Sequence, residues 1–324
     1  MANLTEMSIL QQLHISKVKS TGLSQTVSYH RRTNTILVAE YVDNGGVSKI
    51  KSLRNSPTDE WVLCGEYSFG EKLQSKVIAF FPLEAYEAFM VLCADEQSTC
   101  LVFNLSLKLV NIVNISVRSP VCADFDQNRK DLVIGTKGGK VLALAVRQLT
   151  NRLPAGKIDP ENHSPFKFQV ILRCRVHLDS ELGRKTLQIA TVDLNGTVLV
   201  LTESVNILCL DSSTLETLWI VQSTCFVFQP CKIWVDKFGS NFLVYCKSLE
   251  GKGNSLEYWS PPVDYSLCSV SQFSRSCLTL SSNILGAAIE SLAGENVSST
   301  HVIIVQVNAA LTLLLILFHL HSPN

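Results

Sequence analysis

The sequence predicts an all-β fold built from small antiparallel sheets. Three observations lead to this prediction: a strand–turn–strand pattern that recurs, many short apolar runs separated by turn residues, and no apolar segment with sustained helical spacing between residues 30 and 300. Short apolar runs bounded by Gly, Asn, Asp and Pro are typical of strands. Their frequency along the chain favours a sandwich, a barrel or a propeller.

The clearest hairpin is VIGTKGGKVLALAV, residues 133–146, in which Gly138-Gly139 separates two apolar runs. A two-residue turn of the mirror-image type needs positive φ at both central positions, which glycine adopts without steric cost. Residues 189–202, IATVDLNGTVLVLT, repeat the pattern with Asn195-Gly196 at the turn, an offset of 57 residues (196 − 139). We therefore expect both pairs to form tight turns in a repeated unit.

The apolar runs recur at intervals that suit the blades of a β-propeller. The strand that opens each unit is expected at Ile36, Val91, Val133, Ile189, Leu243 and Ile284. The steps between them are 55, 42, 56, 54 and 41 residues. Propeller blades recur at about 40 to 50 residues, with insertions in their loops. The sequence therefore predicts an irregular β-propeller of five to seven small antiparallel blades over residues 1–300.

The four tryptophans are expected to lie in the protein core. They are Trp61, Trp219, Trp234 and Trp259. Aromatic side chains bury large apolar areas and dominate the energetics of cores. We expect these four to anchor one blade against the next instead of stacking on a ligand.

The charge balance gives no sign of a nucleic-acid partner. Lysine plus arginine equals aspartate plus glutamate, with 28 of each, and charged residues make up only 17% of the chain. A protein that binds the phosphate backbone of DNA or RNA usually carries a clear basic excess. We expect no nucleic acid among the partners.

The cysteines and the N-terminus predict a reducing compartment. The first 20 residues lack the continuous apolar core of a secretory signal. The 11 cysteines are odd in number, include no Cys-x-x-Cys, and mostly lie in apolar runs such as Val62-Leu63-Cys64 and Leu208-Cys209-Leu210. Buried free cysteine behaves as a small apolar residue. A cytoplasmic or nuclear location is therefore expected.

One segment carries a resemblance to known families. Residues 205–221, VNILCLDSSTLETLWIV, combine an apolar strand, an Asp at a tight turn and a strand with Trp219. Together with VIGTKGGKVLAL, this segment resembles the blades of irregular WD-repeat and quinoprotein-like propellers. The resemblance is to degenerate members, since the chain has no Trp-Asp dipeptide. It implies a rigid disc whose loops and rim dock other proteins, and hence a non-catalytic scaffold within an intracellular complex.

The stretch DFDQNRKDLVIG, residues 124–135, is the candidate metal site. Its oxygen ligands would be Asp124, Asp126, Asn128 and Asp131, and alternate carboxylates in a loop suit Ca²⁺. The stretch is similar to the calcium loops of integrin-α-type propellers, but Arg129 stands where those loops place a glycine. We interpret it as a polar turn, and a calcium-dependent propeller remains the alternative.

No motif predicts catalysis. His177-Leu178-Asp179 lacks a nucleophile elbow, EGKGNS at 250–255 lacks the ending of a P-loop, and Cys225 and Cys231 lack the spacing of zinc ligands. We therefore expect no catalytic residue, no cofactor and no enzyme activity.

The last segment, HVIIVQVNAALTLLLILFHLHSPN, is a separate apolar tail at residues 301–324. Val302 to Val305 is β-branched, as in a closing strand, whereas Ala309 to Phe318 is rich in leucine and alanine, as in a helix. We expect a strand followed by a short packed helix. The alternative is a membrane-anchored adaptor, because residues 302–320 approach the length that crosses a bilayer.

Overall fold

The computed structural model describes most of the chain. The described residues are 7–8, 27–41, 46–55, 61–74, 76–149, 167–178, 185–193, 195–226, 228–236, 241–248, 253–261, 273–280, 284–294, 297–307 and 313–321. They fall into two compact units. We call Thr21–Ile134 with Leu142–Arg173 the N-terminal unit, and Met1–Ser20 with Gly135–Val141 and Cys174–Asn324 the C-terminal unit.

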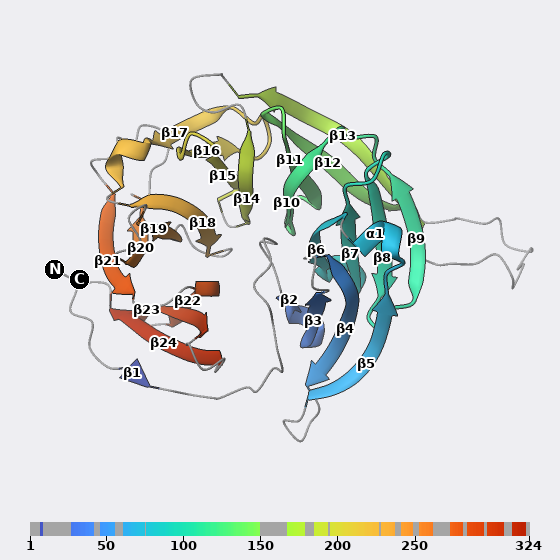
Figure 1. The fold of residues 1–324 in the computed structure, drawn as a ribbon, viewed down its shortest axis with the longest axis horizontal. Coiled ribbons are helices and arrows are strands. Elements are labelled where there is room, and N and C mark those ends of the chain that lie inside the picture. The colour runs from blue at the N-terminus through green and yellow to red at the C-terminus, as the bar shows by residue number, and fades with distance from the viewer. Residues whose placement is uncertain are drawn as a thin grey trace, which may run out of the picture. The chain divides into compact units, whose positions relative to one another are not determined.

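The expected all-β propeller fold is confirmed. The described strands form six four-stranded antiparallel sheets, five of which use four consecutive strands (Figure 1). The first three sheets are β2 (Val27–His30), β3 (Thr35–Tyr41), β4 (Val47–Asn55) and β5 (Trp61–Ser68); β6 (Val77–Leu83), β7 (Ala88–Cys93), β8 (Thr99–Asn104) and β9 (Leu109–Asn114); and β10 (Pro120–Asp126), β11 (Asp131–Thr136), β12 (Lys140–Leu149) and β13 (Lys167–His177).

Two further sheets of consecutive strands and one composite sheet follow. They are β14 (Thr186–Val192), β15 (Thr197–Thr202), β16 (Ile207–Asp211) and β17 (Thr217–Val221); β18 (Gln229–Val235), β19 (Phe242–Lys247), β20 (Asn254–Ser260) and β21 (Ser274–Leu280); and β22 (Ile284–Gly294), β23 (Val297–Val307) and β24 (Leu313–His321) with β1 (Met7–Ser8). The described helical segments are short: α1 (Glu71–Gln74), η1 (Arg31–Thr33), η2 (Glu84–Tyr86) and η3 (Ser223–Cys225).

The first strand of each sheet faces the first strand of the next within each unit. In the N-terminal unit β6 contacts β2 and β10, and in the C-terminal unit β18 contacts β14 and β22. We call the first strand of each sheet its inner strand. In the first sheet β2 is the inner strand and β5 is the outer edge, and the other sheets of consecutive strands follow the same order. The outermost strands of the first three sheets are therefore β5, β9 and β13.

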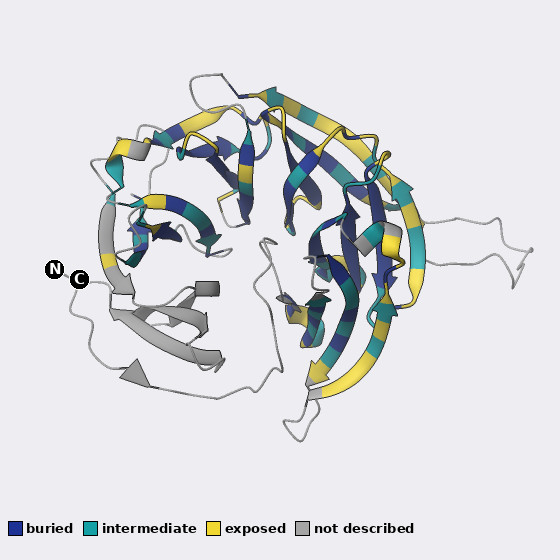
Figure 2. Ribbon diagram, viewed as in Figure 1, coloured by how far each residue is buried: buried dark blue, intermediate teal, exposed yellow. Residues whose placement is uncertain are grey.

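The cores lie between neighbouring sheets because most strands bury both faces. Along β7, Phe89 and Val91 pack into the core shared with β2–β5, while Met90 and Leu92 pack into the core shared with β10–β13. Side chains of a strand alternate between faces, so a continuous apolar run can serve two cores at once. Figure 2 shows this burial concentrated on the inner strands, with exposed residues on the outer ones.

Aromatic residues connect two sheets of the C-terminal unit, as expected for the tryptophans. The ring of Phe242 stacks between Trp219 and Trp259, at centroid distances of 6.0 and 6.1 Å. Both tryptophans are buried in the core between β14–β17 and β18–β21. Trp234 is only partly buried on β18, and the side chain of Trp61 lies outside the described residues.

The tight turns form, but by a different geometry from the one expected. Gly139 and Gly196 have φ of 73° and 59°, whereas Gly138 and Asn195 do not have positive φ. The Gly139 N–H donates to the Thr136 carbonyl at 3.1 Å. The connection from Thr136 to Lys140 thus has three residues, of which the last is left-handed, so the predicted two-residue mirror-image turn at Gly138-Gly139 is wrong in detail. The strands around Gly196 end at Val192 and begin again at Thr197, so that connection is also longer than two residues.

The predicted first strands of the repeat also differ from the structure by one strand at several positions. Gly139 joins the second and third strands of its sheet, whereas Gly196 joins the first and second strands of the next. Likewise Ile36, Val91, Val133 and Leu243 lie on second strands, but Ile189 and Ile284 lie on first strands. Both hairpins are strand–turn–strand units with short connections, so the sequence pattern does not distinguish one from the other.

The segment that carried the family resemblance has the expected local structure. Asp211 ends β16, and its Oδ1 accepts hydrogen bonds from the backbone N–H of Ser213 at 2.7 Å and of Thr214 at 3.0 Å. Leu215 then adopts a φ of 62° before β17 begins. An Asp side chain that binds the backbone of the next residues stabilises such a turn.

The C-terminal tail differs from the expectation. Residues 313–321 form β24, paired antiparallel to β23 with Ile304 opposite Ile316, so the helix expected at Ala309–Phe318 is wrong over the described part. The strand expected at Val302–Val305 is confirmed as part of β23, which runs through residue 300. β1 pairs with β24, with Met7 opposite Phe318. No helix among the described residues is long and apolar enough to cross a membrane.

Candidate functional site

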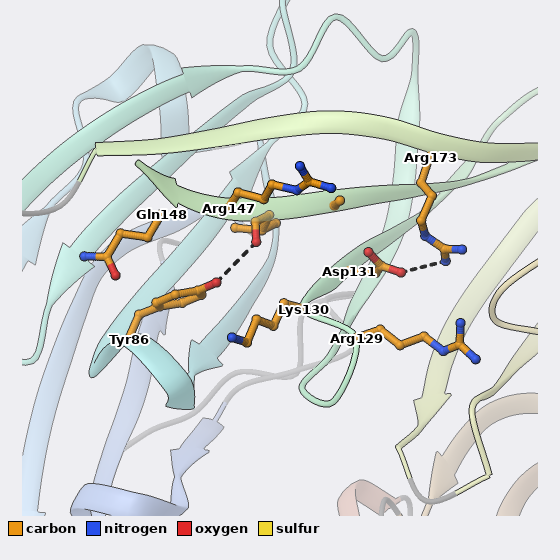
Figure 3. A pocket seen from close by; sticks show the side chains of 9 residues that line it. Tyr86, Arg129, Lys130, Asp131, Arg147, Gln148 and Arg173 are labelled. Atoms are coloured by element: carbon orange, nitrogen blue, oxygen red, sulfur yellow. Dashed lines mark hydrogen bonds and ion pairs between the residues drawn. The ribbon is translucent and has the colours of Figure 1, made fainter. Parts of the chain in front are cut away.

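A basic groove in the N-terminal unit is the candidate functional site (Figure 3). Its volume is about 660 Å³. Four cationic side chains and three other polar residues line it: Arg129, Lys130, Arg147 and Arg173, with Asp131, Tyr86 and Gln148. The groove thus combines four positive charges with one carboxylate.

Three strands and a turn bring these residues together. Arg129 and Lys130 lie in the turn between β10 and β11, Arg147 lies on β12, and Arg173 lies on β13. The Val146 N–H donates to the Lys130 carbonyl at 2.8 Å, which holds the turn against β12. Lys130 has a φ of 58° and is the left-handed residue of its hairpin connection. The groove therefore depends on the pairing of the third sheet.

Asp131 and Arg173 form the ion pair of the groove. The Asp131 Oδ2 lies 2.6 Å from an Arg173 guanidinium nitrogen. The Asp131 side chain is only 3% exposed, and that of Arg173 is 30% exposed. Burial raises the pKa of Asp131, and the neighbouring Arg173 offsets part of this increase. A buried carboxylate needs such a partner to remain ionised.

Tyr86 forms one wall of the groove and its ring is fully engaged. Its hydroxyl donates to the Val146 carbonyl at 3.3 Å. The ring meets the edge of Phe168 with centroids 5.1 Å apart, and the Lys130 ammonium lies 5.4 Å from the ring centroid. Burial raises the pKa of the Tyr86 phenol. Tyr86 therefore holds Lys130 at the groove through a cation–π contact.

The candidate calcium ligands have other roles in the described structure. Asp124 Oδ1 accepts from the Phe125 N–H at 2.8 Å, and Asp126 Oδ1 accepts from the Arg129 N–H at 2.9 Å. Asp131 is paired with Arg173, and Asn128 is exposed in the turn. Within the described ranges, no group of three or more His, Cys, Asp and Glu side chains is arranged to hold a metal ion. The interpretation as a polar turn stays a prediction, with the calcium-dependent propeller as its alternative.

The other candidate motifs are spread over the structure. His177 is exposed at the end of β13, where its Nδ1 lies 3.1 Å from the Leu178 carbonyl oxygen, and Asp179 lies outside the described residues. Of EGKGNS, only residues 253–255 are described, and they lead into β20. Cys225 and Cys231 are free thiols, both partly buried. None of these residues lines the groove.

Five of the ten described cysteines are buried, as their apolar surroundings predict. Cys93, Cys100 and Cys209 lie inside strands, and burial raises the pKa of Cys93 and of Cys209 to about 12. Such thiols stay protonated and unreactive at neutral pH. Cys64 is the exception among those in apolar runs, because it is exposed on the outer strand β5.

The groove is hard to predict from the sequence. Arg129 and Lys130 belong to the candidate calcium loop, where Arg129 takes the place of a glycine, and Arg147 and Arg173 belong to no motif. The available signal was weak: basic residues at 129–130, 147 and 173, each in or beside a predicted strand. Compared with known proteins, the chain matches no family model and no curated protein sequence.

Proposed function

We propose that this protein is a non-catalytic β-propeller that binds other protein subunits within a cytoplasmic or nuclear complex. Its blades would be of the degenerate WD-repeat or quinoprotein-like type, which the resemblance of residues 205–221 supports. The observation that carries the proposal is the set of large apolar side chains exposed on outer strands of the N-terminal unit. They are Val62 and Leu63 on β5, Leu109 and Ile112 on β9, and Ile171 and Leu172 on β13.

Two of these outer strands are linked to each other. The Asn111 side chain on β9 donates to the Phe168 carbonyl on β13 at 3.3 Å. Ile112 is 57% exposed and Leu172 is 49% exposed on these neighbouring strands. The outer edge of an outer strand presents backbone N–H and C=O groups that face away from the sheet. A strand of another protein can pair with these groups. Exposed apolar residues beside such an edge favour a protein interface over a purely solvated rim.

Quantitative affinity capture from the native cells tests the proposal. The test variant is Ile112→Asp with Leu172→Asp, and the matched control is Asn114→Asp with Gln169→Asp, which places the same charges at exposed positions of the same two strands. We expect partner subunits to co-purify with the parent and the control, and to fall by about tenfold or more with the test variant, since apolar anchors dominate interfaces. Equal capture by the test variant would contradict the proposal.

A further inference from the structure

The basic groove concentrates positive charge in a chain that is neutral overall. Its lining carries four cations and one carboxylate, an excess of three positive charges (4 − 1), whereas the whole chain has 28 basic and 28 acidic residues. Asp131 pairs with Arg173, and Lys130 lies over Tyr86. Among the described residues no ion pair involves Arg129 or Arg147. Like charges gathered in one concavity repel each other, and a bound anion relieves that repulsion.

The types of side chain suit a phosphate group. Each guanidinium presents a planar set of N–H donors that binds oxyanions in a bidentate way, and a lysine ammonium adds a point charge. A phosphorylated side chain carries a charge of about −1.5 to −2 and three acceptor oxygens. Arg129, Lys130 and Arg147 therefore match it in charge and in donors. A volume of about 660 Å³ also accommodates residues on either side of the modified one.

The surroundings of Tyr86 argue against single-stranded nucleic acid. Proteins that bind single strands stack bases on open aromatic faces. Here Phe168 meets the Tyr86 ring at 5.1 Å and Lys130 covers it at 5.4 Å, so this ring offers no free platform. The neutral balance of the whole chain points the same way.

We propose that the groove binds an extended segment of a partner protein that carries a phosphorylated side chain, which the positive charge of Arg129, Lys130 and Arg147 around the groove attracts (Figure 3). Arg173 completes the groove from β13, where Asp131 fixes its position. The inference rests on the proposed function, because it assumes a protein partner. It uses different residues from the apolar outer-strand surface, so a failure of the groove and a failure of that surface can be told apart.

Retention of peptides by the immobilised full-length chain tests the inference. The probe is a degenerate peptide library with a central phosphoserine, phosphothreonine or phosphotyrosine, compared with the same library after phosphatase treatment. We expect selective retention of phosphorylated peptides, competed by free inorganic phosphate. Arg129→Glu with Arg147→Glu should reduce retention by about tenfold or more, because charge-assisted hydrogen bonds are lost and repulsion is gained.

Three controls keep the test decisive. Lys108→Glu with Arg118→Glu makes the same charge change at exposed positions outside the groove and should leave retention unchanged. Arg129→Gln with Arg147→Gln removes the charges without reversing them and should also lose retention, and circular dichroism checks that each variant is folded. Ile112→Asp with Leu172→Asp should retain phosphopeptides even where it loses the partner subunits.

Several results would overturn the inference. These are equal retention of the phosphatase-treated library, no retention of either library, or equal loss with the Lys108 and Arg118 control. The groove could instead bind single-stranded RNA or phosphatidylserine vesicles without retaining phosphopeptides. That result would assign the groove to another ligand and would also reject the inference.

Discussion

The carboxylate of Asp131 lies 2.6 Å from the guanidinium of Arg173 and joins the first residue of β11 to the middle of β13. The strand β12 lies between these two strands in the sheet. The ion pair therefore spans three neighbouring strands at the groove. It holds one basic side chain of the groove in place while it satisfies a buried carboxylate.

Arg173→Ala should destabilise the protein, because it leaves the buried Asp131 carboxylate without this partner. We expect a loss of about 1–3 kcal/mol in the free energy of unfolding at neutral pH, less than for a fully buried pair since the Arg173 side chain is 30% exposed. Arg147→Ala, at an exposed position of the same groove, should cost less than about 0.5 kcal/mol. Urea denaturation of both variants measures the difference, and equal stabilities would show that the ion pair contributes nothing.

This loss should depend on pH in a defined direction. Burial raises the pKa of Asp131 above its ordinary value of 3.8, so the folded protein binds this proton more tightly than the unfolded chain does. Loss of Arg173 raises that pKa further. The gap in stability between parent and Arg173→Ala should therefore be largest above the folded-state pKa of the variant and shrink as the pH falls through it towards 3.8. Denaturation across this range measures the gap, and a gap that widens on acidification would refute the assigned cause.

Gly65→Ala should destabilise the contact between the first two sheets. A Cβ atom on Gly65 would collide with the backbone carbonyl of Ser106, in the turn between β8 and β9. The same turn accepts a hydrogen bond at its Leu105 carbonyl from the Ser52 hydroxyl, at 2.6 Å, so it has little freedom to move. We expect a cost of about 1–3 kcal/mol, as for other overpacked sites.

Gly70→Ala is the matched control for this change. A Cβ atom on Gly70 meets no other atom within 4 Å, and its φ is not in the left-handed region. Thermal unfolding should separate the two variants by several degrees. Identical unfolding curves would show that Ser106 does not approach Gly65 closely.

Gly196→Val should destabilise the hairpin between β14 and β15. Its φ of 59° is in the left-handed region, which costs a β-branched residue about 1–2 kcal/mol or more. Gly138→Val is the comparison, because Gly138 does not have positive φ and has open space around it. Denaturant midpoints should fall for Gly196→Val and barely change for Gly138→Val. The reverse order would mean that the two turns have exchanged geometries.

The sequence predicts the repeated hairpins well, because turn residues and apolar runs are local signals. It does not predict where each blade starts. Ile189 was aligned with Val133, yet the first lies on an inner strand and the second on the next strand outward. Which hairpin begins a blade is decided by the contacts of inner strands such as β14 with β18, and these join residues far apart in sequence.

The C-terminal strand and the groove also depend on contacts between residues far apart in the sequence, which local patterns do not predict. The leucine-rich tail favours a helix by propensity, but antiparallel pairing with β23 and with β1, from the opposite end of the chain, overrides it. Arg147 and Arg173 reach one groove only because β12 and β13 are neighbours in the sheet. A site assembled from separate strands leaves no motif in the sequence.

Hydrogen–deuterium exchange on the captured assembly and on the free chain tests the central claim most directly. An outer strand has backbone amides that face away from its sheet and exchange rapidly unless a partner covers them. We expect slower exchange in β9 and β13 within the assembly, around Ile112 and Leu172, and unchanged exchange in β7 and β11, the second strands of the same two sheets. Unchanged exchange in β9 and β13, with protection elsewhere or none at all, would contradict the claim that these outer strands bind the partner.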